Sequence, residues 1–261
     1  MGGRFRGLGG GIGEKTRAAN AAIGRTLFPH FCLVCGKEGR LLCGTCEAEK
    51  YAPERGIFFS LCDRRNERPH PIPPPQAGEG VREGGIRSST ASSIRCFSAG
   101  RYADPVLRQL LQLYKYGRVE EAGQILSDFL AMRVGRHVAT LLDGESDPVV
   151  MPLPMNPINR ALRGFNQAES LALAVSRELE LEMVDGAVRR RFAWKAQASL
   201  TDPRKRRDNI SGAFEARGSL HGRDVLLVDD VFTTGATVRE CAAALMEAGA
   251  GKMTVVTVLK G

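Results

Sequence analysis

Long hydrophobic runs are missing from this 261-residue chain. Its apolar stretches fall far short of the roughly 18 residues that a membrane-spanning helix requires, so the sequence predicts no membrane insertion. The first residues, MGGRFRGLGGGIGEKTRAANAAIG, include early arginines but lack the continuous apolar segment of a secretory signal peptide. We therefore expect a cytoplasmic protein with a flexible N-terminus over residues 1–26.

The composition is that of an ordinary globular protein, with 43% hydrophobic and 25% charged residues. Its length suits one sizeable α/β domain and a smaller attachment. A net charge of +8 favours anionic partners such as nucleic acids or phosphorylated metabolites. Basic residues concentrate between 186 and 223, where they form either a solvated surface or part of an anion site.

Four of the seven cysteines are spaced C-x2-C-x7-C-x2-C in the segment FCLVCGKEGRLLCGTC. Without a secretion signal, such cysteines indicate metal ligands or plain thiols more than disulfides. Two such pairs can place four thiolates around a tetrahedral Zn²⁺, which leaves no open position for catalysis. We predict a structural zinc site, with coincidental buried thiols as the alternative, and its ligands are Cys32, Cys35, Cys43 and Cys46.

The expected zinc module covers residues 27–62 and ends at Cys62, which resembles half of another cysteine pair without its partner. Residues 63–95 are rich in Pro, Gly, Ser and Arg and have almost no large apolar side chains. Such a segment buries too little surface to offset its ordering entropy, so we predict a disordered insert. The remaining domain is expected to span residues 96–261.

Within residues 96–261, apolar patterns of strands and helices alternate. A short strand near residue 96 precedes two helices that are separated near Lys115–Gly117. Further strands are expected at 149–154, 222–230 and 252–260, and further helices at 168–181 and 236–250, the last closed by Gly249. This alternation predicts an α/β fold with a parallel sheet and helices on both faces.

The segment VLLVDDVFTTGAT places Asp229 and Asp230 at the end of a continuous apolar strand. One such carboxylate could simply cap the following helix. Two in succession repel each other unless a cation, a polyhydroxyl ligand or water lies between them. The threonine–glycine turn over 233–237 offers hydroxyls and the start of a helix, which favours a phosphate. A ribose 5-phosphate fits both halves.

This segment resembles the 5-phosphoribosyl-1-pyrophosphate (PRPP) binding motif of type I phosphoribosyltransferases, although Phe232 is bulkier than the usual aliphatic residue. Other segments are similar to the ComF (competence protein F) family: VMPLPMNPINRALRGFNQAESLA, QASLTDPRKRRDNISGAF, LYKYG and the N-terminal cysteine module. The resemblance covers about residues 27–62 and 96–261. It implies a type I phosphoribosyltransferase fold with a small zinc module.

The resemblance also implies roles for individual residues. Asp229 and Asp230 would hold the ribose hydroxyls, and the turn after residue 154, at Met155 and Asn156, would be the pyrophosphate loop. The residues implied for the 5-phosphate are Thr233, Thr234, Gly235, Ala236 and Thr237. Those implied for the Mg²⁺-bound pyrophosphate leaving group are Arg163, Lys195 and Arg206.

Two functions remain open at this point. The first is an enzyme that transfers phosphoribose from PRPP to an unidentified acceptor and releases pyrophosphate. The second is an adaptor with the same fold that binds single-stranded DNA or partner proteins during DNA uptake, as the family's association with competence implies. The acceptor and the oligomeric state are not predicted.

Overall fold

The structure, a computed structural model, describes residues 31–50, 56–61, 70–71, 94–142, 147–191 and 212–261. The chain divides into two units, Met1–Pro53 and Glu54–Gly261, which are described separately. In the first unit, the short helix α2 (Gly44–Lys50) begins between the third and fourth cysteines of the cysteine-rich segment. The predicted flexible segment 1–26 lies outside the described residues.

The second unit is built on a six-stranded sheet with the order β2-β1-β3-β8-β7-β4. The four neighbouring strands from β3 to β4 are parallel, while β1 and β2 pair antiparallel at the opposite edge from β4. The strands are β1 (Ile57–Leu61), β2 (His70–Pro71), β3 (Ile94–Arg101), β4 (Val149–Pro152), β7 (Val225–Phe232) and β8 (Met253–Lys260). A continuous run of buried residues in β7 and β8 is what a strand covered on both faces requires.

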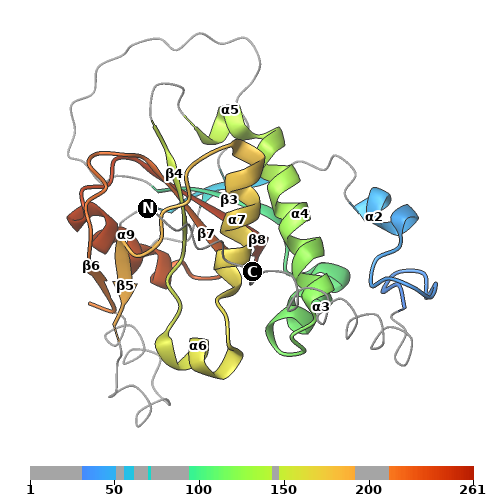
Figure 1. Ribbon diagram of the computed structural model, residues 1–261. Coiled ribbons are helices and arrows are strands. Elements are labelled where there is room, and N and C mark those ends of the chain that lie inside the picture. The colour runs from blue at the N-terminus through green and yellow to red at the C-terminus, as the bar shows by residue number, and fades with distance from the viewer. Residues whose placement is uncertain (1–30, 51–55, 62–69, 72–93, 143–146, 192–211) are drawn as a thin grey trace, which may run out of the picture. The chain divides into compact units, whose positions relative to one another are not determined.

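Helices cover both faces of this sheet (Figure 1). Helices α4 (Glu120–Arg136) and α7 (Gln167–Leu179) pack on one face, and α3 (Pro105–Lys115) packs against α4. Two short helices, α5 (Val138–Leu141) and α6 (Pro157–Arg163), follow α4 and β4. Helix α9 (Ala236–Glu247) contacts a separate two-stranded ribbon of β5 (Val188–Arg190) and β6 (Phe214–Ala216).

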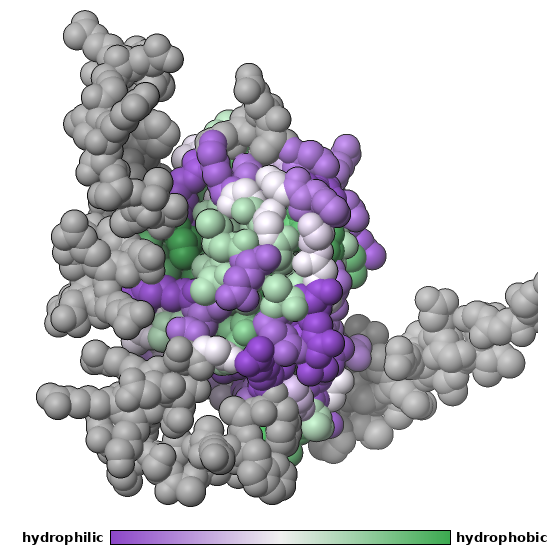
Figure 2. Space-filling view, turned by 90° about the vertical axis from the view of Figure 1, so that its left-hand side faces the viewer, coloured by the Kyte–Doolittle hydropathy of each residue, from purple (hydrophilic) through white to green (hydrophobic). Residues whose placement is uncertain are grey.

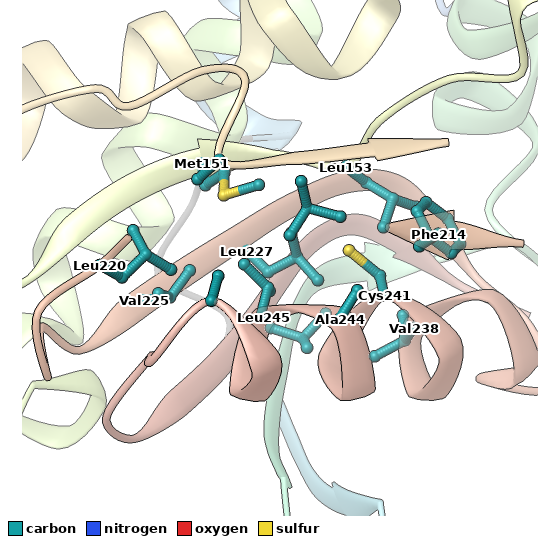
Figure 3. Packing of buried hydrophobic residues seen from close by; sticks show 14 of the residues in the cluster. Met151, Leu153, Phe214, Leu220, Val225, Leu227, Val238, Cys241, Ala244 and Leu245 are labelled. Carbon is teal, nitrogen blue, oxygen red and sulfur yellow. The ribbon is translucent and has the colours of Figure 1, made fainter. Parts of the chain in front are cut away.

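Between the sheet and α9, every second residue of β7 packs against the inner side of that helix. Leu227 lies with Cys241, Ala244 and Leu245 of α9 in one buried cluster, and Phe214 of β6 closes it (Figure 3). Because side chains alternate across a strand, the residues between them face the other helices. Packing on both faces therefore holds β7, and with it the residues at its carboxyl end, in place in the sheet.

Figure 2 shows the side of the second unit where α9 and the ribbon lie in Figure 1, with hydrophobic surface bordered by hydrophilic side chains. Helix α9 is rich in alanine, and its exposed residues include Ala243 and Met246. Its outer surface also carries charge, because Glu247 is exposed and Arg239 and Glu240 are partly exposed.

The alternating strands and helices predicted for residues 96–261 are confirmed, including the break after Lys115. Gly249 follows the last turn of α9 with a φ of 76°, as a residue just past a helix end should. Two segments differ from expectation. Ile57–Leu61, placed in the zinc module, pairs with β3 in the main sheet. His70–Pro71, within the predicted insert 63–95, pairs with β1. The other insert residues up to 93 lie outside the described residues, and so does Cys62.

Among the helices of the described ranges, none combines the length and the apolar character needed to cross a bilayer.

Candidate functional site

The candidate site begins where β7 leaves the core. Val225–Val228 are buried, whereas Asp229 and Asp230 are half-buried at the carboxyl end of the strand. The chain then turns over residues 233–235 and enters α9 at Ala236. Ligands of open α/β sheets bind outside the carboxyl ends of the parallel strands, which is where this turn lies.

Asp230 is paired with Lys115, the last residue of α3. The Lys115 Nζ lies 2.7 Å from Asp230 Oδ2, and the two side chains are only 16% and 13% exposed. This ion pair ties the end of α3 to the end of β7. Lys115 therefore faces the carboxylates at the end of β7.

Asp229 has a different environment. Its Oδ1 accepts the backbone N–H of Asp230 at 2.8 Å, and its charge acts on Arg190 of β5 and Cys241 of α9. Since Lys115 belongs to α3 and Cys241 to α9, the neighbouring carboxylates meet different elements. The repulsion expected from the sequence is nevertheless present, since the charge of Asp230 raises the pKa of Asp229, and Lys115 opposes this effect.

The surroundings of Asp229 change its protonation. Burial raises the pKa of Asp229 to about 8, the charge of Asp230 adds to this, and the Asp230 amide, Lys115 and Arg190 oppose it. Burial lowers the pKa of Arg190, although the charge of Asp229 opposes this, and the Arg190 guanidinium lies 5.4 Å from the centre of the Phe214 ring. Near pH 7, Asp229 is therefore largely a proton-bearing carboxyl group.

The turn after β7 offers hydroxyls and the start of a helix. Thr233 and Thr234 are exposed, and Thr234 Oγ1 accepts the backbone N–H of Ala236, the first residue of α9, at 3.4 Å. Arg239, one turn into the helix, donates from Nη1 to the Thr234 carbonyl at 3.2 Å. Exposed hydroxyls and the positive end of the helix dipole make this turn suitable for a phosphate group.

Gly235 is required in this turn for two reasons. Its φ of 73° lies in the left-handed region, and a Cβ there would come within 2.8 Å of Leu61 Cδ1 and Phe232 Cζ. Only glycine satisfies both conditions without strain or a shift of neighbours. The sequence prediction that Gly235 shapes the turn accords with this geometry.

The turn after β4 lies at the same edge of the sheet. Strand β4 pairs parallel with β7, with Pro152 opposite Val228, and Met155 and Asn156 follow its end. The Asn156 side chain accepts the Ile158 amide at 2.9 Å and so caps α6. Buried Asn166 donates to the Leu153 carbonyl at 3.2 Å and caps α7, which holds this turn in place.

The predicted leaving-group residues are only partly described. Arg163 lies over the Tyr116 ring, 5.6 Å from its centre, and donates to Gln167 Oε1 at 3.3 Å. Arg163 is therefore held against Tyr116, the residue that follows Lys115. Lys195 and Arg206 lie outside the described residues.

Three residues of this region escaped the site prediction: Lys115, Arg190 and Asn166. Asn166 had a local signal, because an asparagine directly before an amphipathic helix is a typical N-cap. Lys115 and Arg190 had none, since their roles depend on which elements the tertiary fold brings together.

The four cysteines of the first unit meet at one point. Their sulfur atoms all lie within 4.8 Å of one another. Burial opposes ionisation of Cys32, but amides of Cys43, Cys35 and Val34 donate to its sulfur and lower the pKa of the thiol to about 6. An ionised thiol in a four-sulfur cluster is what Zn²⁺ requires, so these residues fit a structural zinc ion.

A magnesium ion that accompanies PRPP would need oxygen ligands. Asp229 and Asp230 offer carboxylate oxygens at the candidate site, and the two threonines offer hydroxyls. The donor set is therefore compatible with Mg²⁺ held mainly by a bound phosphate ligand.

Residues 166–261 match the family described as "Phosphoribosyl transferase domain". The chain is 32% identical to DNA utilization protein YhgH of Escherichia coli K12, covering 62% of this chain and 70% of the relative. It is 30% identical to competence protein F of Haemophilus influenzae, covering 60% and 68%. Adenine phosphoribosyltransferase of Saccharomyces cerevisiae is 17% identical over 56% of this chain and 72% of that one, with a TM-score of 0.33.

Proposed function

The chain belongs to the competence protein F family, and from this premise we propose that it binds PRPP together with Mg²⁺. One observation carries the proposal: two carboxylates at the end of β7 share an edge of the sheet with the start of α9 and the exposed threonines before it. Carboxylates accept hydrogen bonds from sugar hydroxyls, and the helix start attracts a phosphate. Together they match a phosphorylated ribose.

In this proposal, each part of the site holds one part of PRPP. Asp229 and Asp230 bind the ribose hydroxyls, and the turn from Thr233 to Thr237 binds the 5-phosphate. The turn at Met155 and Asn156 receives the pyrophosphate group. Arg163, Lys195 and Arg206 are the proposed cations for the leaving group, since guanidinium and ammonium groups bind phosphate oxygens strongly.

The proposed reaction is phosphoribosyl transfer. A nucleophilic acceptor forms a bond to C1 of the ribose, the bond from C1 to pyrophosphate breaks, and pyrophosphate leaves with the bonding electrons. Such a reaction depends on electrostatic stabilisation of the leaving group and of the cationic sugar. Mg²⁺, when bound, supplies positive charge to the pyrophosphate oxygens.

The ion pair between Lys115 and Asp230 gives the proposed binding a specific requirement. Asp230 can accept a hydrogen bond from a ribose hydroxyl in two ways: it keeps its ion pair with Lys115 and uses a free lone pair, or the ion pair breaks. In this proposal, Lys115 therefore lies beside the bound ribose.

Calorimetry with PRPP and Mg²⁺ tests the pocket. Asp229→Asn combined with Asp230→Asn should abolish binding, because an amide cannot supply two acceptor oxygens and the negative charge is lost. Asp147→Asn is a suitable control, since this exposed carboxylate lies ahead of β4 and pairs with Arg223. Unchanged affinity in the double variant would refute the site.

A second function is favoured by a different observation. Three exposed arginines of the β5–β6 region, Arg189, Arg191 and Arg217, converge on the single carboxylate of Glu215 and leave excess positive charge. Such a surface, and a relative named a DNA utilization protein, support an adaptor that binds single-stranded DNA or a partner in DNA uptake.

The two functions are separated by the release of pyrophosphate. The protein is incubated with PRPP and Mg²⁺ and with a panel of nitrogenous bases and amines. Release that depends on an acceptor supports the enzyme. Salt-sensitive binding of single-stranded DNA without any such release supports the adaptor.

A further inference from the structure

A groove of about 570 Å³ lies on the helical face of the second unit, where α4 and α7 run side by side (Figure 1). One wall is a stripe of α4: Glu120, Gly123, Gln124 and Ser127. Residues at this spacing of three, four and seven share one face of a helix over two turns. The groove is therefore aligned with the helix axis.

The opposite wall is a stripe of α7 with the same spacing: Ser170, Leu173, Ala174 and Arg177. Small residues on both stripes leave the space between the outer sides of the two helices unfilled, while larger residues beneath them are buried. The groove is therefore a consequence of the small residues that the sequence places along both stripes. It lies within the range of about 300–1,000 Å³ that is typical of small-molecule sites.

Two aromatic rings close one end of the groove. The Tyr114 and Phe165 rings lie 5.2 Å apart at an angle of 44°. Gly123 permits this arrangement, because a Cβ there would meet the Tyr114 ring at 2.4 Å. Together with half-exposed Leu173, the rings offer an apolar surface for a flat group.

The polar groups of the groove favour an anion. Arg118 and Arg177 line it opposite one carboxylate, that of Glu120. Ser127 is 4% exposed, and among the described residues its hydroxyl has no hydrogen-bond partner. A buried hydroxyl without a partner carries an energetic cost that a bound polar group would relieve.

From these observations we propose that the groove between α4 and α7 is a second ligand site, for a planar anion of the nucleoside monophosphate class. The base lies against Phe165 and Leu173, the sugar hydroxyls reach Ser127 and its neighbours, and the phosphate lies with Arg177. Arg118, at the aromatic end of the groove, donates from Nη2 to the Leu162 carbonyl at 2.7 Å. A flat ring, a phosphate and hydroxyls match the three kinds of surface that the groove presents.

The groove is directly connected to the candidate PRPP site. Tyr114 precedes Lys115, which pairs with Asp230, and Phe165 precedes Asn166, which holds the turn after β4. A ligand that shifts either ring therefore acts on a residue of that site. This second site does not depend on PRPP binding, so it can be tested even if the proposed function fails.

Calorimetry of the full chain with adenosine 5′-monophosphate tests the proposal. Arg177→Gln should weaken binding by about tenfold, the effect of losing one charged hydrogen bond. Ala174→Trp should fill the groove and remove binding. Matched controls are Arg108→Gln on α3 and Ala243→Trp on α9, both at exposed positions outside the groove, and both should bind as the unaltered chain does.

Competition distinguishes this groove from the candidate PRPP site, whose phosphate turn could also accept a nucleotide. Binding in the groove should persist in saturating PRPP with Mg²⁺ and in the Asp229→Asn, Asp230→Asn double variant. The proposal is overturned if no nucleoside monophosphate binds. It is equally overturned if PRPP displaces the nucleotide, or if Ala174→Trp and Arg177→Gln bind it unchanged.

Discussion

Lys115 and Asp230 form a largely buried ion pair, with Nζ and Oδ2 2.7 Å apart. One partner ends α3 and the other ends β7, so the contact depends on the packing of two elements that are distant in sequence. A pair this shielded from water is screened less by salt than a surface pair. The ligand-free site therefore carries its own cation beside its carboxylates.

Replacement of Lys115 should shift the pH dependence of PRPP binding. The ionised form of Asp229 is the better hydrogen-bond acceptor, so affinity should rise with pH through about 8, the pKa of this carboxyl group. Lys115 lowers that pKa. In Lys115→Met, the midpoint should move upward by about half a unit to one unit, with weaker binding at pH 7. Calorimetry at several pH values measures the midpoint.

Arg108→Met on the same helix controls for the loss of a cation, because Arg108 is exposed. Its midpoint should equal that of the unaltered chain. If both variants leave the midpoint in place, Lys115 has only a structural role at the end of α3.

Asp229 should also make folding stability depend on pH. Its pKa is raised from 3.8 to about 8 in the folded protein, so the folded state keeps a proton that the unfolded state releases above about pH 4. Stability should therefore fall as the pH rises from about 4 to 8, because the folded state binds more protons than the unfolded state.

Asp229→Asn removes this dependence. Relative to the unaltered chain, the variant should gain at least about 1.4 kcal/mol, the value of one pKa unit, between pH 5 and pH 8. Urea unfolding at both pH values gives the difference. An equal effect of the substitution at pH 5 and pH 8 contradicts the raised pKa.

Two glycines with nearly equal backbone angles should respond differently to alanine. Gly235 and Gly249 have φ values of 73° and 76°, so both variants pay a left-handed backbone cost of about 1–2 kcal/mol. At Gly235 the added Cβ also meets Leu61 and Phe232 at 2.8 Å, whereas at Gly249 it meets only a backbone nitrogen at 4.0 Å.

Gly235→Ala should therefore be less stable than Gly249→Ala by about 1–3 kcal/mol, as expected for overpacking. It should also lose PRPP binding, while Gly249→Ala retains it. Urea unfolding and calorimetry provide the two measurements, and equal stability of the variants would argue against a tightly packed turn.

The cysteine cluster should bind one zinc ion. Metal analysis of freshly purified protein should find about one equivalent, and modification of the thiols should release it, because thiolates are the ligands. Cys43→Ser should lower the zinc content. Cys241→Ala is the control, since this buried thiol lies beneath β7. Protein without zinc, or without a change in Cys43→Ser, contradicts the site.

Much of the fold follows from local sequence. The apolar run of β7, the glycine of its turn and the start of α9 are neighbours in the chain, so their order predicts the structure of the turn. The same applies to the cysteine pairs. Ile57–Leu61 was misplaced because a five-residue strand is too short to show which sheet it joins, and its partner β3 lies more than 30 residues onward.

The candidate site was predictable to the extent that it is contiguous. Asp229, Asp230 and the threonines lie in one segment, whereas Lys115 and Arg190 reach it from other elements. Arg190 shows the limit clearly. Its neighbours Arg189 and Arg191 are exposed and pair with Glu215, and no pattern in three consecutive arginines indicates that the middle one stacks on Phe214.

Strand β1 determines where the protein can be shortened. Phe59 and Leu61 are fully buried, and Leu61 packs beneath Gly235 of the turn between β7 and α9. A truncation that starts at residue 63, the end of the predicted module, would remove this strand and leave β3 as an unprotected edge open to aggregation. A truncation that starts at Glu54 keeps β1, and is the version of the second unit to express alone.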